Sequence, residues 1–380
     1  MSRSKIQSTL DRHFTWRVSS LDKKLVGLRD AFDSWRAIQT IQKRVKNRLP
    51  IIMVIDVEPD EFFIARTQPV PWKGYENVWR FFHQLRPVLS ERTGASVHYS
   101  WYFRMDPQVE EVYGAPAWAV THYAKFVDDC VANGDELGLH PHDYRWEPKA
   151  DNWIIDHGNQ PWIDHCVRMA FATFREAFGK DCDSFRFGDR WMNDQTLALV
   201  ESLGARFDLT LEPGRPSKLA TYPDKPFSGS LPDYAGVPRS PFRPSKLDFR
   251  KPDFTRTEGI WVIPMSTYLK HEEEALVRFW GKLISAEPSI RSCHMLNLGY
   301  DAEFFRRGVD RVLRSSKNPY LSFVIRSDIG TNRKLWENLQ KSFDSILNHP
   351  LVNRFIFSTP AETMRMLGFL HSDQNITQTT

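Results

Sequence analysis

Residues 51–61 read IIMVIDVEPDE, an apolar run followed directly by acidic side chains. The run Ile51–Ile55 is apolar on both faces, which is typical of a central strand in a parallel sheet that is covered by helices on both sides. Asp56 and Glu58 lie two residues apart, so both carboxylates face the same side of an extended chain, and Asp60 follows just beyond. Ligands of parallel α/β folds bind at the carboxyl ends of the strands. The stretch therefore predicts a buried central strand with an acidic site at its end.

Strand-like and helical segments alternate along the chain from this strand onward. Strands are expected at Ile51–Val57, Val97–Arg104, Glu136–His140, Ser184–Phe187, Arg206–Thr210, Ile260–Ile263, His294–Leu298, Tyr320–Ile325 and Arg354–Ser358. Helical patterns lie at Tyr75–Leu89, Ala117–Asn133, Trp162–Phe178, Asp194–Leu203, Glu272–Ser285, Ala302–Leu313 and Lys334–Asn348. This order predicts an α/β fold with a mostly parallel sheet or barrel. No GxGxxG stretch or Walker loop occurs, which argues against dinucleotide and P-loop chemistry.

Three segments fall outside this alternation. Residues 1–48 carry twelve Lys or Arg against four Asp or Glu, and apolar residues recur from Leu21 to Val45 at spacings of three and four, which predicts a basic amphipathic helical arm. We expect the arm to pack on the rest of the chain or on a second subunit; a peripheral membrane contact is the less favoured alternative. Residues 211–255 hold nine of the 24 prolines and are expected to cover or line a functional site. The polar residues 371–380 are expected to be a disordered tail.

Composition narrows the class of protein. With 380 residues, 41% hydrophobic and 26% charged, the chain is an ordinary globular protein with a large core. The four cysteines form no zinc or disulfide pattern, which favours free thiols in a reducing compartment. No apolar leader opens the sequence, so we expect a cytoplasmic protein. No nucleic-acid-binding motif accompanies the basic arm, and we expect no nucleic-acid partner.

A pair of histidines follows the third expected strand. Residues 135–146 read DELGLHPHDYRW, in which Gly134 is a plausible helix stop and Pro141 favours extended geometry at His140. His140 and His142 then project from the same face and form half of a metal site; the alternative is a polar loop with two unrelated histidines. Together with a carboxylate from the first strand they form a common ligand set for a hydrolytic zinc or related divalent ion.

An arginine ends the next strand, within residues 183–191, DSFRFGDRW. Arg186 is expected to reach the carboxylates at the same edge of the sheet, where it would hold one of them ionised and oriented. The alternative is an ordinary ion pair on the rim of a barrel.

In order and content, the segments IDVEPD, DELGLHPHDYRW and SFRFGDRW resemble the motifs of the polysaccharide deacetylase (NodB-homology) superfamily. The resemblance implies a distorted (β/α) barrel over residues 49–370 and metal-dependent removal of an N-acyl group from a sugar. It also implies that Asp56 is the catalytic base, that Glu58, His140 and His142 are the metal ligands, and that Arg186 orients the base. We expect zinc as the metal, and Arg326, Asp60 and Trp191 as substrate-binding residues.

Two departures from the family pattern leave alternatives open. The family's histidine pair is usually spaced i, i+4, whereas position 144 is Tyr, so His142 is taken as the second ligand. Arg326 stands where the family carries a catalytic histidine after a strand. The expected substrate is an N-acetylated or N-formylated saccharide in surface-polysaccharide synthesis, lipid- or nucleotide-linked and possibly anionic. One alternative is a catalytically silent member that binds glycan or a partner. The other is a phosphotransferase of the haloacid-dehalogenase type, although the DxD motif expected of that type reads DVEPD here. The oligomeric state is open in every case.

Overall fold

The structure is a computed structural model that describes residues 48–270, 292–315 and 319–370. The expected helical arm, the helical pattern Glu272–Ser285 and the expected tail lie outside these residues. Within them, no helix is both long and apolar enough to cross a bilayer.

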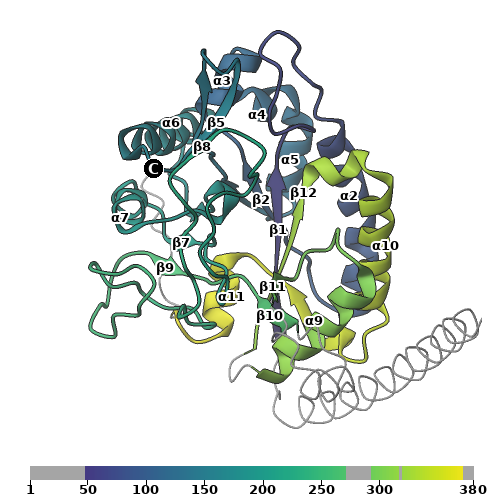
Figure 1. The fold of residues 1–380 in the computed structure, drawn as a ribbon. Coiled ribbons are helices and arrows are strands. Elements are labelled where there is room, and N and C mark those ends of the chain that lie inside the picture. Colours follow the sequence, from purple (N-terminus) through teal and green to yellow (C-terminus); the bar gives the residue numbers. More distant parts are fainter. Residues whose placement is uncertain (1–47, 271–291, 316–318, 371–380) are drawn as a thin grey trace, which may run out of the picture.

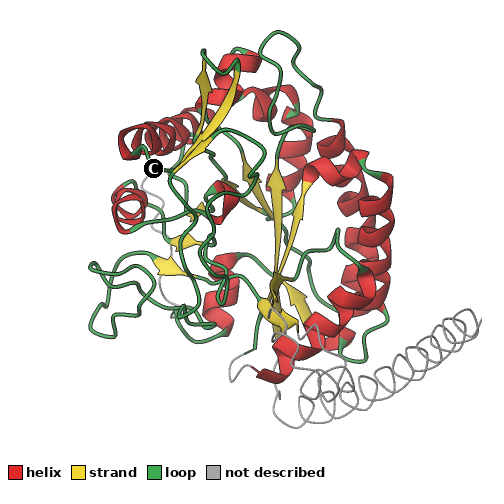
Figure 2. Ribbon diagram, viewed as in Figure 1, coloured by secondary structure: helices red, strands yellow, loops and turns green. Residues whose placement is uncertain are grey.

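A curled, parallel sheet forms the centre of the fold (Figure 2). Its strands run in the order β12-β1-β2-β3-β6-β7-β9, and β13 also pairs with β1. Their bounds are β1 Leu49–Val57, β2 Ser100–Phe103, β3 Glu136–Leu139, β6 Ser184–Phe185, β7 Phe207–Asp208, β9 Trp261–Val262, β12 Leu321–Arg326 and β13 Phe355–Phe357. The α/β class and the parallel sheet expected from the sequence are thereby confirmed, and the curled half-barrel is consistent with a distorted barrel.

Helices lie on the outside of the curled sheet, with α2 and α10 beside β12 in Figure 1 and α6 and α7 on the opposite side. Their bounds are α2 Lys73–Thr93, α3 Pro107–Tyr113, α4 Trp118–His122, α5 Ala124–Ala132, α6 Gln160–Phe178, α7 Asp194–Ser202, α9 Ala302–Ser315, α10 Arg333–Leu347 and α11 Pro360–Met366, with short 3-10 turns at η1 Gly188–Arg190, η2 Ser327–Thr331 and η3 Val352–Arg354. The single helix expected over Ala117–Asn133 is wrong, because the chain breaks at Tyr123 into α4 and α5.

Alternation along the strands divides the core into an outer shell and an inner filling. Ile51, Met53 and Ile55 of β1 face outward and pack with Tyr75, Val78 and other residues of the helices. Ile52 and Val54 face inward and pack with apolar side chains of β2, β7, β9, β12 and α11. Side chains at even positions of β1 therefore point into the barrel, and α11 closes its amino-terminal end.

Two smaller sheets complete the fold. β4 (Tyr144–Glu147), β5 (Asn152–Asp156) and β8 (Phe227–Ser228) form one, near the end to which β1 points (Figure 1). The second pairs β10 (Thr267–Lys270) with β11 (Ser292–Met295) in antiparallel fashion. Just beyond these strands, backbone hydrogen bonds from Leu296 to Ser266 (3.1 Å) and from Val324 to Leu296 (3.0 Å) link the segment after β9 to β12.

Candidate active site

Strand alternation brings four charged side chains to one end of the barrel. Asp56 and Glu58 continue the inward face of Ile52 and Val54 on β1. Arg326 continues the inward face of Val324 on β12, and its backbone lies in register with that of Asp56. Arg186 follows β6 between Phe185 and Phe187, both of which belong to the outer shell. These charged side chains therefore lie together at the carboxyl ends of the strands, next to the apolar residues that fill the barrel interior.

Asp56 and Arg186 form a buried ion pair. The Arg186 Nε lies 3.1 and 3.2 Å from the two carboxylate oxygens of Asp56, and its Nη1 donates to the Leu209 carbonyl at 2.7 Å. Burial acts to lower the pKa of Arg186, but the charges of Asp56 and Glu212 outweigh it and raise that pKa. The guanidinium is thus fixed at both ends and holds the Asp56 carboxylate in one orientation.

Glu58, His140 and His142 place their ligand atoms within 4.8 Å of one another, and all three side chains are buried. The His140 Nε2 lies 3.2 Å from Glu58 Oε1 and 3.3 Å from His142 Nε2. The His140 Nδ1 lies 2.9 Å from the Arg186 carbonyl, which only accepts, so this nitrogen carries the proton. In the neutral imidazole the Nε2 lone pair then faces a carboxylate, an arrangement that either a proton on Nε2 or a metal ion between the two groups would stabilise.

The remaining features of this group fit a divalent metal ion. Glu58 Oε2 is buried and has no hydrogen-bond partner within the described chain. Burial tends to lower the pKa of His140, yet the Asp56 and Glu58 charges outweigh it and raise that pKa, so the local field favours positive charge. A carboxylate and two imidazole nitrogens form the ligand set of many hydrolytic zinc sites, which leave a further position open. The described residues therefore provide three side chains that could together hold a metal ion.

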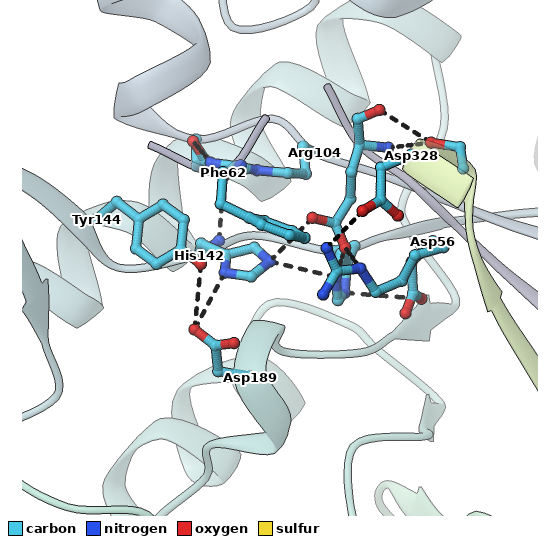
Figure 3. Close-up of polar contacts among 12 residues, drawn as sticks. Asp56, Phe62, Arg104, His142, Tyr144, Asp189 and Asp328 are labelled. Atoms are coloured by element: carbon cyan, nitrogen blue, oxygen red, sulfur yellow. Dashed lines mark hydrogen bonds and ion pairs between the residues drawn. The ribbon is translucent and has the colours of Figure 1, made fainter. Parts of the chain in front are cut away.

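A second carboxylate, that of Asp189, faces the Nδ1 nitrogen of His142. The Asp189 Oδ2 lies 3.6 Å from His142 Nδ1 and accepts a hydrogen bond of 3.2 Å from the Tyr144 hydroxyl (Figure 3). The backbone N–H of His142 donates to Asp106, which is itself held by Arg104. A carboxylate behind a metal-binding histidine commonly orients the ring, so Asp189 stands where such a partner of His142 would be expected.

The turn after β6 is shaped around His142. An added Cβ at Gly188 would lie 2.4 Å from three atoms of the His142 ring. The next two residues, Asp189 and Arg190, adopt left-handed backbone with φ of 51° and 58°. Such a conformation costs of order 1 kcal/mol or more for a non-glycine residue, and it is found preferentially where function requires it.

Gly188→Ala is expected to displace the His142 ring and to weaken metal affinity by roughly 10–100-fold, the range seen when the support of a ligand is lost. Metal content after dialysis against a graded chelator measures this. Gly236→Ala is the matched control, because an added Cβ there meets no atom within 4 Å. Wild-type affinity in a folded Gly188→Ala variant would refute the placement of His142.

Arg326 reaches the site from β12. Its Nη2 lies 3.0 Å from Asp328 and its Nη1 3.3 Å from the Tyr222 hydroxyl, while its Nε is 3.6 Å from Glu58 Oε1. The guanidinium carbon lies 3.5 Å from the centre of the Phe62 ring, a cation–π contact. Arg326 therefore stands directly beside the expected metal ligand Glu58.

A cavity of about 320 Å³ opens over these groups. The proline-rich residues 211–255 contribute Glu212, Arg215, Lys218, Thr221 and Leu231 to its wall. Its other lining residues are Asp56, Glu58, His140, His142, Arg186, Asp189, Arg190, Met295, Asn297, Tyr300 and Arg326. The irregular segment thus lines the site, as its composition predicts.

Two residues expected to bind substrate lie outside this wall. Asp60 accepts hydrogen bonds from the backbone of Lys73 (3.1 Å) and Gly74 (2.8 Å), so it holds the start of α2. Trp191 is buried in the outer core and stacks on His157 with ring centres 5.5 Å apart.

The sequence interpretation missed Asp189, Arg190 and Glu212. Asp189 and Arg190 follow Arg186 within the same motif, and Gly188 is the one signal for the tight turn that aims them at the site. Glu212 belongs to the irregular segment, where no periodicity indicates the direction of a side chain.

No protein-family model and no curated protein matches the chain. Matches to solved structures cover most of it at low sequence identity. A glycoside hydrolase/deacetylase structure from Parabacteroides distasonis is 13% identical, with 86% of this chain and 72% of that one covered and a TM-score of 0.49. A structure assigned as a polysaccharide deacetylase from Mycobacterium smegmatis is 10% identical, covering 85% and 91%, with a TM-score of 0.46. The Puue allantoinase is 13% identical, covering 86% and 92%, also with a TM-score of 0.46.

Proposed function

We propose that the chain is a metal-dependent hydrolase of the polysaccharide deacetylase type, which removes an N-acetyl or N-formyl group from an amino sugar. The observation that carries this proposal is the buried Asp56–Arg186 pair beside the Glu58, His140 and His142 group in one cavity. This arrangement joins a fixed base to a three-ligand metal site, the combination that hydrolysis of an unreactive amide requires.

Glu58, His140 and His142 would hold the metal, for which we propose zinc; when bound, it polarises the amide carbonyl and lowers the pKa of water. Asp56 accepts the proton of the attacking water, since Arg186 holds its carboxylate in a fixed orientation. The departing nitrogen must in turn receive a proton. Arg326 does not supply it, because a guanidinium stays protonated at any accessible pH. Asp56, which then holds the proton from water, is the group that delivers it.

The substrate is a saccharide, and we propose a lipid- or nucleotide-linked precursor in surface-polysaccharide synthesis. The cytoplasmic location expected from the sequence supports such a precursor over a finished polymer. Purified protein should contain one divalent metal per chain by elemental analysis and should release acetate or formate from N-acylated amino sugars. A protein that contains no metal after growth with zinc, and that releases neither acid, would contradict the proposal.

A catalytically silent, glycan-binding protein is the second candidate, and Arg326 favours it. Its guanidinium Nε lies 3.6 Å from Glu58 Oε1 and so competes with a metal for the same carboxylate. The two candidates differ in the same assay. The silent protein would bind N-acetylated sugar at the cavity without releasing any acid, with or without added metal.

A further inference from the structure

The cavity wall holds more positive charge than its own carboxylates neutralise. Its ionised side chains are five cations (Arg186, Arg190, Arg215, Lys218 and Arg326) and four carboxylates (Asp56, Glu58, Asp189 and Glu212). Asp56 is paired with Arg186, Asp189 faces His142, and Glu58 belongs to the metal group. A divalent metal would add two further positive charges. Arg326 is paired with Asp328, which lies outside the wall. The excess is therefore local: Arg190, Arg215 and Lys218 have only the Glu212 carboxylate on their side of the cavity, and this side favours an anion.

Glu212 is the carboxylate nearest to two guanidinium groups of the cavity wall, those of Arg190 and Arg215. Arg215 Nε donates to Glu212 Oε2 at 2.8 Å, which satisfies this carboxylate oxygen. Arg190 Nη1 lies 4.0 Å from the same oxygen, beyond hydrogen-bond distance. Within the described residues, Arg190 Nη1 is buried and has no hydrogen-bond partner. A buried guanidinium with a free donor is costly unless a ligand completes it.

The backbone fixes the position of Arg190. Its φ of 58° is left-handed, and its carbonyl accepts a hydrogen bond of 2.7 Å from the buried Tyr234 hydroxyl. Burial, the largest cause, and the neighbouring Arg215 charge lower the pKa of Arg190, although the Glu212 charge acts to raise it. Lys218 stands farther out, exposed, with its Nζ 3.4 Å from the Thr221 carbonyl.

We propose that Arg190, Arg215 and Lys218 form an anion-binding subsite that takes a phosphate or carboxylate carried by the substrate. This inference rests on the proposed function, because it assumes that the saccharide binds in this cavity. Planar guanidinium groups donate in pairs to oxyanions, and a lysine at the rim adds a mobile positive charge. The guanidinium of Arg326 already contacts Asp328, Tyr222 and Phe62. We therefore assign the anion to Arg190, Arg215 and Lys218 and not to Arg326.

Titration calorimetry on the metal-loaded protein tests the subsite with three probes. N-acetylglucosamine 1-phosphate carries a phosphate, N-acetylmuramic acid carries a carboxylate, and N-acetylglucosamine carries neither. Wild-type protein is expected to bind one of the charged sugars at least tenfold more tightly than the neutral one, and the tighter of the two identifies the source of the anion. Added salt should reduce this preference.

Arg190→Gln is expected to weaken binding of the preferred charged sugar roughly 10–100-fold, as for loss of a hydrogen bond to a charged group. Lys218→Gln, at an exposed position that tolerates substitution, should weaken it about two- to fivefold. Neither change should alter affinity for the neutral sugar or the metal content. Lys246→Gln is the control, because it removes an exposed charge from the same proline-rich segment outside the cavity wall.

Equal affinity for charged and neutral sugars in the wild type would overturn the subsite, as would unchanged affinity in both variants. These results differ from failure of the proposed function. A protein without metal or acid release that still loses charged-sugar binding in Arg190→Gln would retain the subsite and refute the hydrolase. A protein that releases acid equally well from neutral and charged sugars would retain the hydrolase and refute the subsite.

Discussion

Replacing Asp56 with Asn is expected to abolish acid release while leaving the bound metal in place. An amide cannot accept the proton of water, and loss of general acid–base assistance lowers rates by roughly 10²–10⁴-fold. The loss should be at the upper end, because Asp56 both takes the proton from water and returns it to nitrogen. Metal should be retained, since the ligand atoms come from Glu58, His140 and His142. Acid release and metal content, measured on the same preparation, test both statements.

Asp128→Asn is the control for Asp56→Asn, because Asp128 is an exposed carboxylate on α5. Arg186→Ala should reproduce part of the loss: kcat falls while KM changes little, because Arg186 contacts the base and not the substrate. Wild-type turnover in Asp56→Asn would remove this residue from the mechanism. Loss of metal together with activity would show that Asp56 acts as a ligand instead.

Replacing His140 with Ala is expected to remove the metal. His140 contributes the central nitrogen of the group, within 3.2 Å of Glu58 Oε1 and 3.3 Å of His142 Nε2. Metal affinity should fall by more than the roughly 10–100-fold that follows the loss of an outer partner of a ligand. Elemental analysis after dialysis measures it, and circular dichroism establishes that the variant is folded.

His83→Ala is the matched control for His140→Ala. His83 lies half-exposed on α2, where it pairs with Asp129, and it takes no part in the site. Metal content should stay at the wild-type level in this variant. A folded His140→Ala protein that still holds one metal per chain would refute the ligand assignment.

The sheet was predictable because burial on both faces leaves a plain pattern. Ile51–Ile55 marks the central strand, and each strand expected within the described residues has a counterpart there. The hairpin of β4 and β5 was missed, although Tyr144 and Trp146 alternate with polar residues before the turn at Asp151, whose φ is 46°. The break at Tyr123 carries neither proline nor glycine, so tertiary packing of aromatic rings, such as Tyr123 on Tyr75 of α2, overrides local helix propensity there.

Site residues could be predicted where a strand determines which way their side chains point, but not where they lie in a loop. Asp56, Glu58, His140 and His142 follow from the two-residue period of extended chain. The role of Asp60 in substrate binding stays a prediction, and its distance from the strand end gave no hint that α2 would begin against its carboxylate. The role of Trp191 in substrate binding also stays a prediction; its burial in the core was not indicated, because an aromatic residue near a motif suits either place. Asp189 and Arg190 depend on two left-handed residues in succession, which sequence patterns do not indicate.

The inward face of the strands has a consequence for how such a protein can change over evolutionary time. A deletion of one residue within β1 ahead of Asp56 would turn the carboxylates outward and the apolar filling with them, so foldability and chemistry would be lost in a single step. A point substitution on that face does not change which residues point inward, so it lacks this effect. We therefore expect insertions and deletions mainly in segments such as residues 211–255, which contribute no strand to the central sheet. Relatives of this protein should thus differ in the walls of the cavity, and hence in the molecules they accept, while strand lengths up to the reactive groups stay constant.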